Sequence, residues 1–561
     1  MSPSLRTGVR NDATVLAAAI ALLFAVPPTL RAQTADGACS VYLESADFVG
    51  PAADLARLID LQDSTSNVSF AHRRASLGYT GDACAAPTGI SDIALKLGTA
   101  PPRTGVRLLP AELLVVGNSA YPRDWNDGVL WSGRGLNTAL TAGGRVRWGP
   151  LSAAVAPVVT WQSNGDYDMQ PSVGGRSDFA NPWWSTIDKP QRFGAESFGR
   201  IDAGQSYVRI DARGFAAGVS HENIRWGPSV RNPLMLSGTA GGFAHLFLET
   251  GRPVDIWIGD LEMQMFWGRL EESDLFDEDP DNDQRALAGL LMAFQPRVFD
   301  GLMLGGGRIQ ALTWWPELSL SDVLLRPYRG VGANPRGRTG DNQLITVFFR
   351  WAAAPAGLEV YGEWARDDHW EEWIGLLRNL DASQAWTLGL QRLIRRGDDA
   401  LRLSAEVTHL SDALPIRFAT RGILAFYTNT SVRQGHTHRG QMLGAPVGVG
   451  SESLFIGGDY FWRAGRTSLS VERARYDDDA YHNAYSTDFG GGARDTEVSV
   501  RAGHLAALGS LAVDATLGWS IRYNRDFLGL DEIVAGTEDR FRRDVNWSLR
   551  LQARWTQQGW R

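Results

Sequence analysis

The sequence predicts an all-β protein, a transmembrane antiparallel β-barrel of about 18 strands preceded by a small, partly helical element. Residues 511–523 alternate between apolar side chains such as Leu517 and polar ones such as Asp514. Residues 545–555 repeat the pattern, which a helix of period 3.6 cannot produce. Strands with one apolar and one polar face, in a chain that carries a secretory leader, are typical of an outer-membrane barrel.

Residues 1–32 are predicted to be a signal peptide that is cut near Ala32. Arg6 and Arg10 precede the apolar run 15–26, which is too short to cross a bilayer as a helix. No later stretch reaches the ~20 consecutive apolar residues of a membrane helix. If the mature chain enters a membrane it must therefore do so as strands, and the bacterial outer membrane is its expected location.

Residues 33–105 are predicted to form a small periplasmic or plug-like element. Residues 51–61 begin with proline and carry apolar residues at helical spacing, which predicts one short helix. Cys39 and Cys84 are the only cysteines of the chain, and an oxidising periplasm favours a disulfide between them. The alternative is two unpaired buried thiols. The sequence does not decide whether this element enters the barrel.

Residues 106–561 are predicted to form the barrel, because short and long connections alternate along them. Eight short turns and nine long loops imply about 18 strands, an even number that returns both ends of the chain to the periplasmic side. The short turns are expected at residues 149–150, 212–214, 249–253, 295–301, 354–357, 395–399, 464–466 and 507–509.

The polar face of these strands carries charges of both signs. A charge that faces lipid at mid-depth costs about 2–4 kcal/mol, so the charged side chains are expected to point into the lumen. Glu359, Glu363 and Asp514 would then face Arg350 and Arg522. Such a lumen indicates internal ion pairs rather than a wide selective pore.

The overall charge argues against nucleic acid as a partner. The chain is formally −8, and removal of the leader, with three arginines and one aspartate, leaves about −10. The mean hydropathy of −0.20 fits a barrel in which only alternate residues face lipid. No cofactor is expected.

Four stretches resemble the Wzi-type capsule-assembly family of outer-membrane proteins. They are residues 130–137 (LWSGRGLN), 220–247 (beginning SHENIRWGPSVRNP), 259–273 (GDLEMQMFWGRLEES) and 435–450 (GHTHRGQMLGAPVGVG). The resemblance implies a single-chain, occluded barrel of 18 strands that acts as an outer-membrane lectin. It also implies that the IRWGP stretch lies in a loop folded into the barrel, where a structural role as plug and hydrogen-bond hub is the alternative to ligand contact.

Sugar recognition needs aromatic faces that stack on pyranose rings and polar groups that bind hydroxyls and uronate carboxylates. The predicted outer loops supply both. The alternative is that the tryptophans form the outer interfacial girdle and that the arginines pair with lipopolysaccharide or loop carboxylates. The candidate polysaccharide-binding residues are Trp125, Trp131, Arg134, Asn137, Asn223, Arg225, Trp226, Trp314, Trp315, Arg336, Arg338, His436, His438 and Arg439.

Metal and enzyme interpretations have weaker support. His436 and His438 would share one face of an extended segment, but no third ligand is identifiable. The acidic run 277–283 lacks the glycine and glutamate of an EF-hand loop. Common hydrolase motifs are absent, and His245 or His409 beside a serine is the arrangement to test.

The sequence thus predicts an outer-membrane protein that binds or organises capsular or extracellular polysaccharide and performs no covalent chemistry. Its expected partners are that polysaccharide, outer-membrane lipid, lipopolysaccharide and other components of polysaccharide export. The alternatives are a porin for small solutes or oligosaccharides and, with less support, an outer-membrane hydrolase. Conductance in planar bilayers would separate the lectin from the porin.

Overall fold

The computed structural model describes residues 38–43, 57–58, 61, 75–80, 104–173, 177–279, 282–313, 341–367, 383–412, 425–462, 465–484, 493–508, 510–530 and 541–555. Several predictions lie outside these residues. They concern the signal peptide 1–32, Cys84 of the predicted disulfide, most of the helix at 51–61, and the candidate site residues Trp314, Trp315, Arg336 and Arg338.

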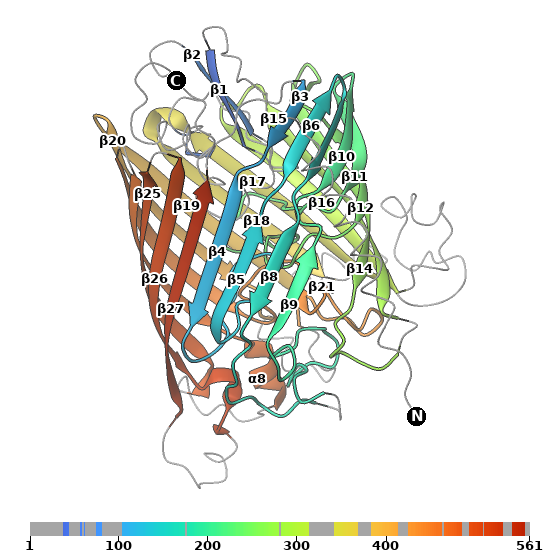
Figure 1. Cartoon of the computed structure of the whole chain (residues 1–561), viewed down its shortest axis with the longest axis vertical. Coiled ribbons are helices and arrows are strands. Elements are labelled where there is room, and N and C mark those ends of the chain that lie inside the picture. Colours follow the sequence, from blue (N-terminus) through green and yellow to red (C-terminus); the bar gives the residue numbers. More distant parts are fainter. Residues whose placement is uncertain are drawn as a thin grey trace.

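One antiparallel sheet of 23 strand segments forms the body of the described part of the chain (Figure 1). The last segment pairs with an early one, Trp555 opposite Ala111 through Ser548 opposite Asn118, so the sheet closes on itself. The early segments are β3 (Gly105–Leu108), β4 (Ala111–Asn118), β5 (Gly135–Thr141), β6 (Gly144–Trp148), β7 (Leu151–Val155), β8 (Val158–Gln162), β9 (Phe198–Asp202), β10 (Tyr207–Ala212), β11 (Phe215–Ser220), β12 (His245–Thr250) and β13 (Val254–Asp255).

The later wall strands are longer, mostly 11–13 residues. This length suits a tilted strand that crosses a bilayer. They are β14 (Gly259–Glu271), β15 (Gln284–Pro296), β16 (Leu302–Thr313), β17 (Asp341–Ala353), β18 (Leu358–Asp367), β19 (Gln384–Arg396), β20 (Asp399–His409), β23 (Glu452–Trp462), β24 (Gly465–Arg475), β25 (Thr496–Leu508), β26 (Leu511–Tyr523) and β27 (Arg543–Trp555).

Five of the early strands are interrupted. In each of them, two consecutive segments lie in line and pair with the same neighbouring strands of the wall. These pairs of segments are β3 and β4, β5 and β6, β7 and β8, β9 and β10, and β12 and β13. Within the described residues the 23 segments therefore run as 18 wall strands, which confirms the predicted number. At one interruption, a Cβ on Gly143 would lie 2.0 Å from the carbonyl oxygen of Val155, so the close approach requires glycine there.

The predicted position of one turn is wrong. Residues 249–253 are not the reversal between two strands, because Val254 and Asp255 still pair with β14. The chain reverses at residues 256–258, where Trp257 adopts a positive φ of 72°. The segment Gly251–Pro253 is instead the interruption between β12 and β13. In the sequence, its Gly and Pro residues look like those of a turn between two strands.

The alternation seen in the sequence matches the two faces of the wall. On β26, Leu517 is 53 % exposed while Asp514 is 7 % exposed, and on β27 Leu549 is 46 % exposed. Apolar residues thus point outward to where lipid would lie, and charged residues point into the lumen, as predicted.

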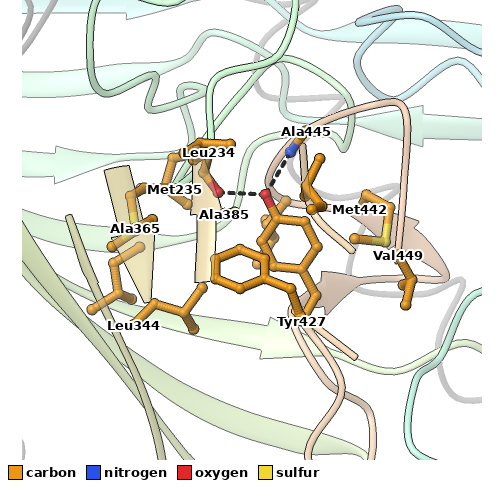
Figure 2. Packing of buried hydrophobic residues seen from close by; sticks show 14 of the residues in the cluster. Leu234, Met235, Leu344, Ala365, Ala385, Tyr427, Met442, Ala445 and Val449 are labelled. Atoms are coloured by element: carbon orange, nitrogen blue, oxygen red, sulfur yellow. Dashed lines mark hydrogen bonds between the residues drawn. The ribbon is translucent and has the colours of Figure 1, made fainter. Parts of the chain in front are cut away.

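The lumen is filled by two long loops, residues 221–244 between β11 and β12 and residues 425–451 before β23, which we call the plug. The plug includes the short hairpin β21 (Thr437–His438) and β22 (Gln441–Met442). Its apolar residues join those of the wall in one buried cluster (Figure 2). The Tyr427 hydroxyl donates to the carbonyl of Leu234 at 2.5 Å and accepts from the N–H of Ala445 at 2.9 Å, which ties the two loops together.

The remaining described elements are small. At the short-turn end, β1 (Ala38–Leu43) pairs with β2 (Ala75–Thr80) in a separate sheet (Figure 1). The other elements are α8 (Asp478–Ala484) in a long loop and two 3-10 turns, η3 (Ala354–Ala356) and η5 (Arg525–Phe527). None of the described helices is long and apolar enough to span a membrane.

One N-terminal side chain reaches the wall and the plug. Arg57, which is helical, pairs with Glu359 of β18, donates to the carbonyl of Pro228 in the plug, and lies 4.5 Å from the ring centre of Tyr361. Leu58 is also buried. The part of residues 33–105 around Arg57 therefore contacts the inside of the barrel.

Candidate functional site

Two buried carboxylates of the wall hold one end of the plug. Glu406 of β20 accepts hydrogen bonds from the backbone N–H groups of residues 230–232 at 2.8–3.1 Å and from the Tyr361 hydroxyl at 2.7 Å. Glu363 of β18 accepts from two further plug N–H groups, one of them that of Ser229, at 2.7 and 3.0 Å. Because these N–H groups belong to a loop without ladder partners, the wall carboxylates fix where the loop sits.

The charges of the lumen are paired, as the two-signed pattern predicted. Most pairs join neighbouring strands, so they brace the wall rather than line an open channel. They include Arg350 with Glu359 at 2.9 Å, Arg402 with Asp459 at 2.8 Å, Arg466 with Asp514 at 2.9 Å, Arg501 with Glu472 at 2.9 Å and, from the plug, Arg231 with Glu472 at 3.0 Å.

Several aromatic residues of the outer loops that the structure describes lie inside the mouth of the barrel, among them the predicted Trp125. Two guanidinium groups lie near the ring of Trp125, that of Arg231 at 4.5 Å and that of Arg501 at 5.2 Å from its centre. Tyr121 and Trp184 are buried, and the Trp184 indole donates to the Asp477 carboxylate at 2.9 Å. The girdle alternative is thus wrong for Trp184, because a girdle residue would face lipid on the outside of the wall.

Trp131 belongs to a second aromatic group. Its ring lies 5.1 Å from that of Phe193 and 6.4 Å from that of Phe198. Arg200 of β9 lies over both phenylalanines, 4.7 and 5.0 Å from their ring centres. This arrangement combines flat apolar faces with a planar cation, which is the chemistry of a site for an acidic sugar.

Arg134 and Asn137 have different surroundings, although they are three residues apart. Arg134 is exposed, and its Nε donates to the carbonyl of Ser119 at 3.1 Å. Asn137 is fully buried and donates to the carbonyl of Gly133 at 2.8 Å. Of the two, Arg134 is available to a ligand at the outer surface, while Asn137 holds its own loop.

The IRWGP stretch lies in the plug. Asn223 donates to the carbonyl of Ala240 at 2.7 Å, which closes the loop on itself. Arg225 donates to plug carbonyls at 2.5 and 3.1 Å. Trp226 is 1 % exposed and its indole donates to Gln264 of β14 at 2.6 Å. These three predicted site residues fix the plug in the lumen.

His436 and His438 are both buried in the plug, 3 % exposed each. The Nε2 of His436 lies 2.6 Å from the carbonyl oxygen of Met235, and its ring stacks on Tyr427 at 5.3 Å. The Nδ1 of His438 accepts from the N–H of Glu271 at 3.1 Å. Burial lowers the pKa of His436 to about 4 and that of His438 well below its usual range. Both rings are therefore neutral near pH 7.

The described residues contain no group of three or more His, Cys, Asp or Glu side chains that could hold a metal. In the acidic run 277–283, the described side chains bond to loop neighbours, such as Asn282 to Asp279 at 3.2 Å, and Asp281 lies outside the described residues. Burial raises the pKa of nearby Glu272 to about 8, so this carboxyl is largely protonated at neutral pH.

Arg439 connects two strands that are not hydrogen-bonded neighbours. Its guanidinium lies 2.6 Å from Glu271 of β14 and 3.1 Å from Asp202 of β9. Asp202 also lies 3.4 Å from Nδ1 of His221. The sequence predicted Arg439 as a site residue but missed Asp202, His221 and Glu271, because nothing in their spacing shows that the wall brings them together.

One of the histidines proposed for hydrolysis lies in a serine–histidine–carboxylate arrangement. Nδ1 of His409 is 3.0 Å from Glu452, and its Nε2 is 3.5 Å from the hydroxyl of Ser411. Ser411 is fully buried, and its hydroxyl also lies 3.3 Å from Glu452. A nucleophile must reach its substrate, so this arrangement is better suited to bracing the end of β20. His245, the other candidate, bonds to the carbonyl of Phe243 at 2.8 Å.

Neither a protein-family model nor a curated protein matches the sequence. Among solved structures, the fold is similar to that of Wzi of Escherichia coli, an outer-membrane protein involved in group 1 capsule assembly and described as a carbohydrate-binding β-barrel. The two share 13 % identity with a TM-score of 0.53, over 79 % of this chain and 83 % of Wzi.

More distant likenesses are to OccAB3 of Acinetobacter baumannii, with 11 % identity and a TM-score of 0.37, and to OprD of Pseudomonas aeruginosa, with 10 % identity and a TM-score of 0.34. They cover 80 % of this chain and 98 % and 92 % of those chains. The likeness to the Wzi barrel shows that the fold is that of an outer-membrane β-barrel.

Proposed function

We propose that this protein binds exported polysaccharide at the outer face of the outer membrane and holds or organises it there, as in capsule assembly, without covalent chemistry. The observation that carries the proposal is the plug. A barrel whose lumen holds residues 221–244 and 425–451, packed into one buried cluster with the wall, is built to present a surface rather than to pass solutes. The likeness to the Wzi barrel supports the same function.

The long-loop end supplies the groups that a glycan needs. Arg134 is exposed, Arg439 is 35 % exposed, and Trp125 is only partly buried near two arginines. The buried residues of the predicted site, such as Trp226 and His436, act by holding these groups in place. The exposed set is therefore the part of the predicted site that meets polysaccharide.

The remaining parts of the proposal follow from the sequence. Residues 1–32 direct the chain out of the cell, residues 33–105 lie at the periplasmic end and reach into the barrel around Arg57, and a Cys39–Cys84 disulfide stabilises this element. Lipid and lipopolysaccharide surround the wall, and other polysaccharide-export components are partners at the periplasmic end.

One observation favours the alternative, a porin. A small pocket that is partly open to solvent lies between the plug and the wall strands β4, β5, β8 and β9. It extends from Leu109 and Pro110, near the short-turn end, to Asp202 and Asn223. This pocket would widen into a channel if the plug moved.

Two measurements on the purified protein separate these functions. Planar-bilayer recording is expected to show no steady conductance, and a column carrying extracellular polysaccharide is expected to retain the barrel. A large steady conductance together with no retention would refute the proposal in favour of the porin. A His409→Ala variant is expected to bind as the wild type does, whereas loss of a measurable hydrolysis in this variant would support the enzyme.

A further inference from the structure

The outer half of the barrel wall is incomplete between β9 and β14. Strands β11 and β12 have only 6 residues each, and both stop at the pair Ser220 and His245, from which the chain turns into the lumen as the plug. Among the described residues, β9 pairs along one edge only, with β8. Beyond Gly268, β14 likewise pairs only with β15. We call this interval between β9 and residues 269–271 the notch.

The plug hairpin closes the notch from inside. The N–H of Arg439 donates to the carbonyl of Glu271 at 2.8 Å, and the N–H of Arg269 donates to the carbonyl of Ala244 at 2.9 Å. The Arg439 side chain then spans the interval to Asp202. Arg439 adopts a positive φ of 50°, which a non-glycine residue accepts only when its surroundings fix it.

The aromatic group around Trp131 lines the notch. A Cβ added to Gly440, at the tip of the hairpin, would lie 2.8 Å from the ring of Phe193. The guanidinium of Arg200 lies over both Phe193 and Phe198. Aromatic faces, the hairpin tip and Arg200 are therefore in one place at the outer end of the barrel.

Two hydrogen-bond donors in the notch have no partner among the described residues. The Nη1 of Arg200 is one, and the Nε2 of His438 is the other. Since the Nδ1 of His438 accepts a hydrogen bond and the ring is neutral, Nε2 carries the proton. Nδ1 binds the β14 edge, so Nε2 on the opposite side of the ring points away from it. A buried donor without an acceptor is destabilising, so both donors need an oxygen acceptor.

The notch contains charges of both signs, and Arg200 is the cation that lies on its aromatic faces. Its other guanidinium groups are those of Arg269 and Arg439; its carboxylates are those of Asp202 and Glu271, and those of Asp188 and Asp274 also act on Arg200. Arg269 and Arg439 are 40 % and 35 % exposed, so they are accessible from outside.

We propose that the notch binds a carboxylate-bearing sugar of the glycan, with Arg200 and His438 donating to the carboxylate and Phe193 and Phe198 packing on the ring. The inference rests on the proposed function and names its substrate class as an acidic polysaccharide. Arg439 lies over this site and must move aside from Asp202 for the sugar to enter.

The test is the affinity of the full-length barrel for polygalacturonate and for the same polymer after reduction of its carboxyl groups. Arg200→Met keeps the packing of the side chain but removes its donors. His438→Asn keeps an acceptor for the N–H of Glu271 but removes the Nε2 donor. Arg543→Met removes an exposed arginine of β27 outside the notch and is the matched control. Gel mobility with and without heating shows that each barrel is folded.

We expect Arg200→Met and His438→Asn to weaken polygalacturonate binding about tenfold, since each removes a hydrogen bond to a charged group. Binding of the reduced polymer and binding by Arg543→Met should stay within about twofold of the wild type. Unchanged affinity of both folded notch variants for polygalacturonate would overturn the inference while leaving the proposed function intact. Failure of the wild type to bind any glycan would refute both. If Arg200→Met loses binding to lipopolysaccharide but keeps its affinity for polygalacturonate, the notch binds lipid phosphate and the inference is also overturned.

Discussion

Replacing Glu406 by alanine should release the plug from the wall. The carboxylate of Glu406 accepts from the N–H groups of residues 230–232 and from the Tyr361 hydroxyl, at 2.7–3.1 Å. A hydrogen bond to a charged group contributes about 1.5–3 kcal/mol, and water that enters the vacated space restores part of it. A net loss of about 4 kcal/mol over the four bonds raises the detached population of this segment about a thousandfold.

Planar-bilayer recording detects this population, because a segment that detaches from Glu406 leaves a gap between the plug and the wall beside β18 and β20. Brief conducting events that are absent from the wild type should appear in Glu406→Ala and become more frequent when Glu363 is also replaced. Asp459→Ala is the matched control, since Asp459 is a buried lumen carboxylate that pairs with Arg402 and Arg466 of the wall. A folded Glu406→Ala barrel that stays silent, or an equal effect of Asp459→Ala, would refute the reasoning.

Three further predictions follow from single contacts. Trp226→Phe removes the indole donor to Gln264 and should lower the denaturation midpoint by an amount equivalent to about 1–3 kcal/mol; an unchanged midpoint would contradict the buried hydrogen bond. Leu517→Arg places a charge at the lipid-facing middle of β26 and should cost about 2–4 kcal/mol in folding into vesicles, whereas no cost would mean that Leu517 does not face lipid. Burial raises the pKa of Asp477 to about 7, so its contribution favours folding at low pH and is lost as the pH rises from about 4 through 7. Hydrogen exchange around α8 should therefore speed up from pH 5 to pH 8, after correction for intrinsic rates, and Asp477→Asn should remove most of that change.

The wall of the barrel could be predicted from the sequence because each of its strands has a local signal. The alternation of apolar and polar residues on β26, such as Leu517 and Asp514, repeats every two residues. Because only one face of the strand is buried, this repeat determines which side chains face the lumen. The number of strands could be counted because short turns and long loops, which are also local features, alternate along the chain. The turn at 249–253 was misplaced because Gly251 and Pro253 give the same local signal at a strand interruption as at a reversal.

The site was only partly predictable, because its contacts join residues that are far apart in the chain. Trp226 and Arg439 were identified, and the resemblance placed Trp226 in an inward loop, yet the sequence could not show which wall residues either side chain contacts. Arg200 and Asp202 are two apart on β9 and look like ordinary lumen residues. Their role depends on β11 and β12 being only six residues long, and the local sequence of those strands does not show that they are so short.

The pairing of β27 with β4 has a consequence for how the barrel is made. This pairing joins residues 111–118 to residues 548–555, so the two edges meet only after nearly the whole chain is present. Contacts of such high sequence separation form late and slowly. Until then, both edges offer unpaired N–H and C=O groups to any other strand. Assembly of this protein should therefore require protection of β4 and β27 until they meet, and truncation within the last strand should leave an open sheet that aggregates rather than a smaller barrel.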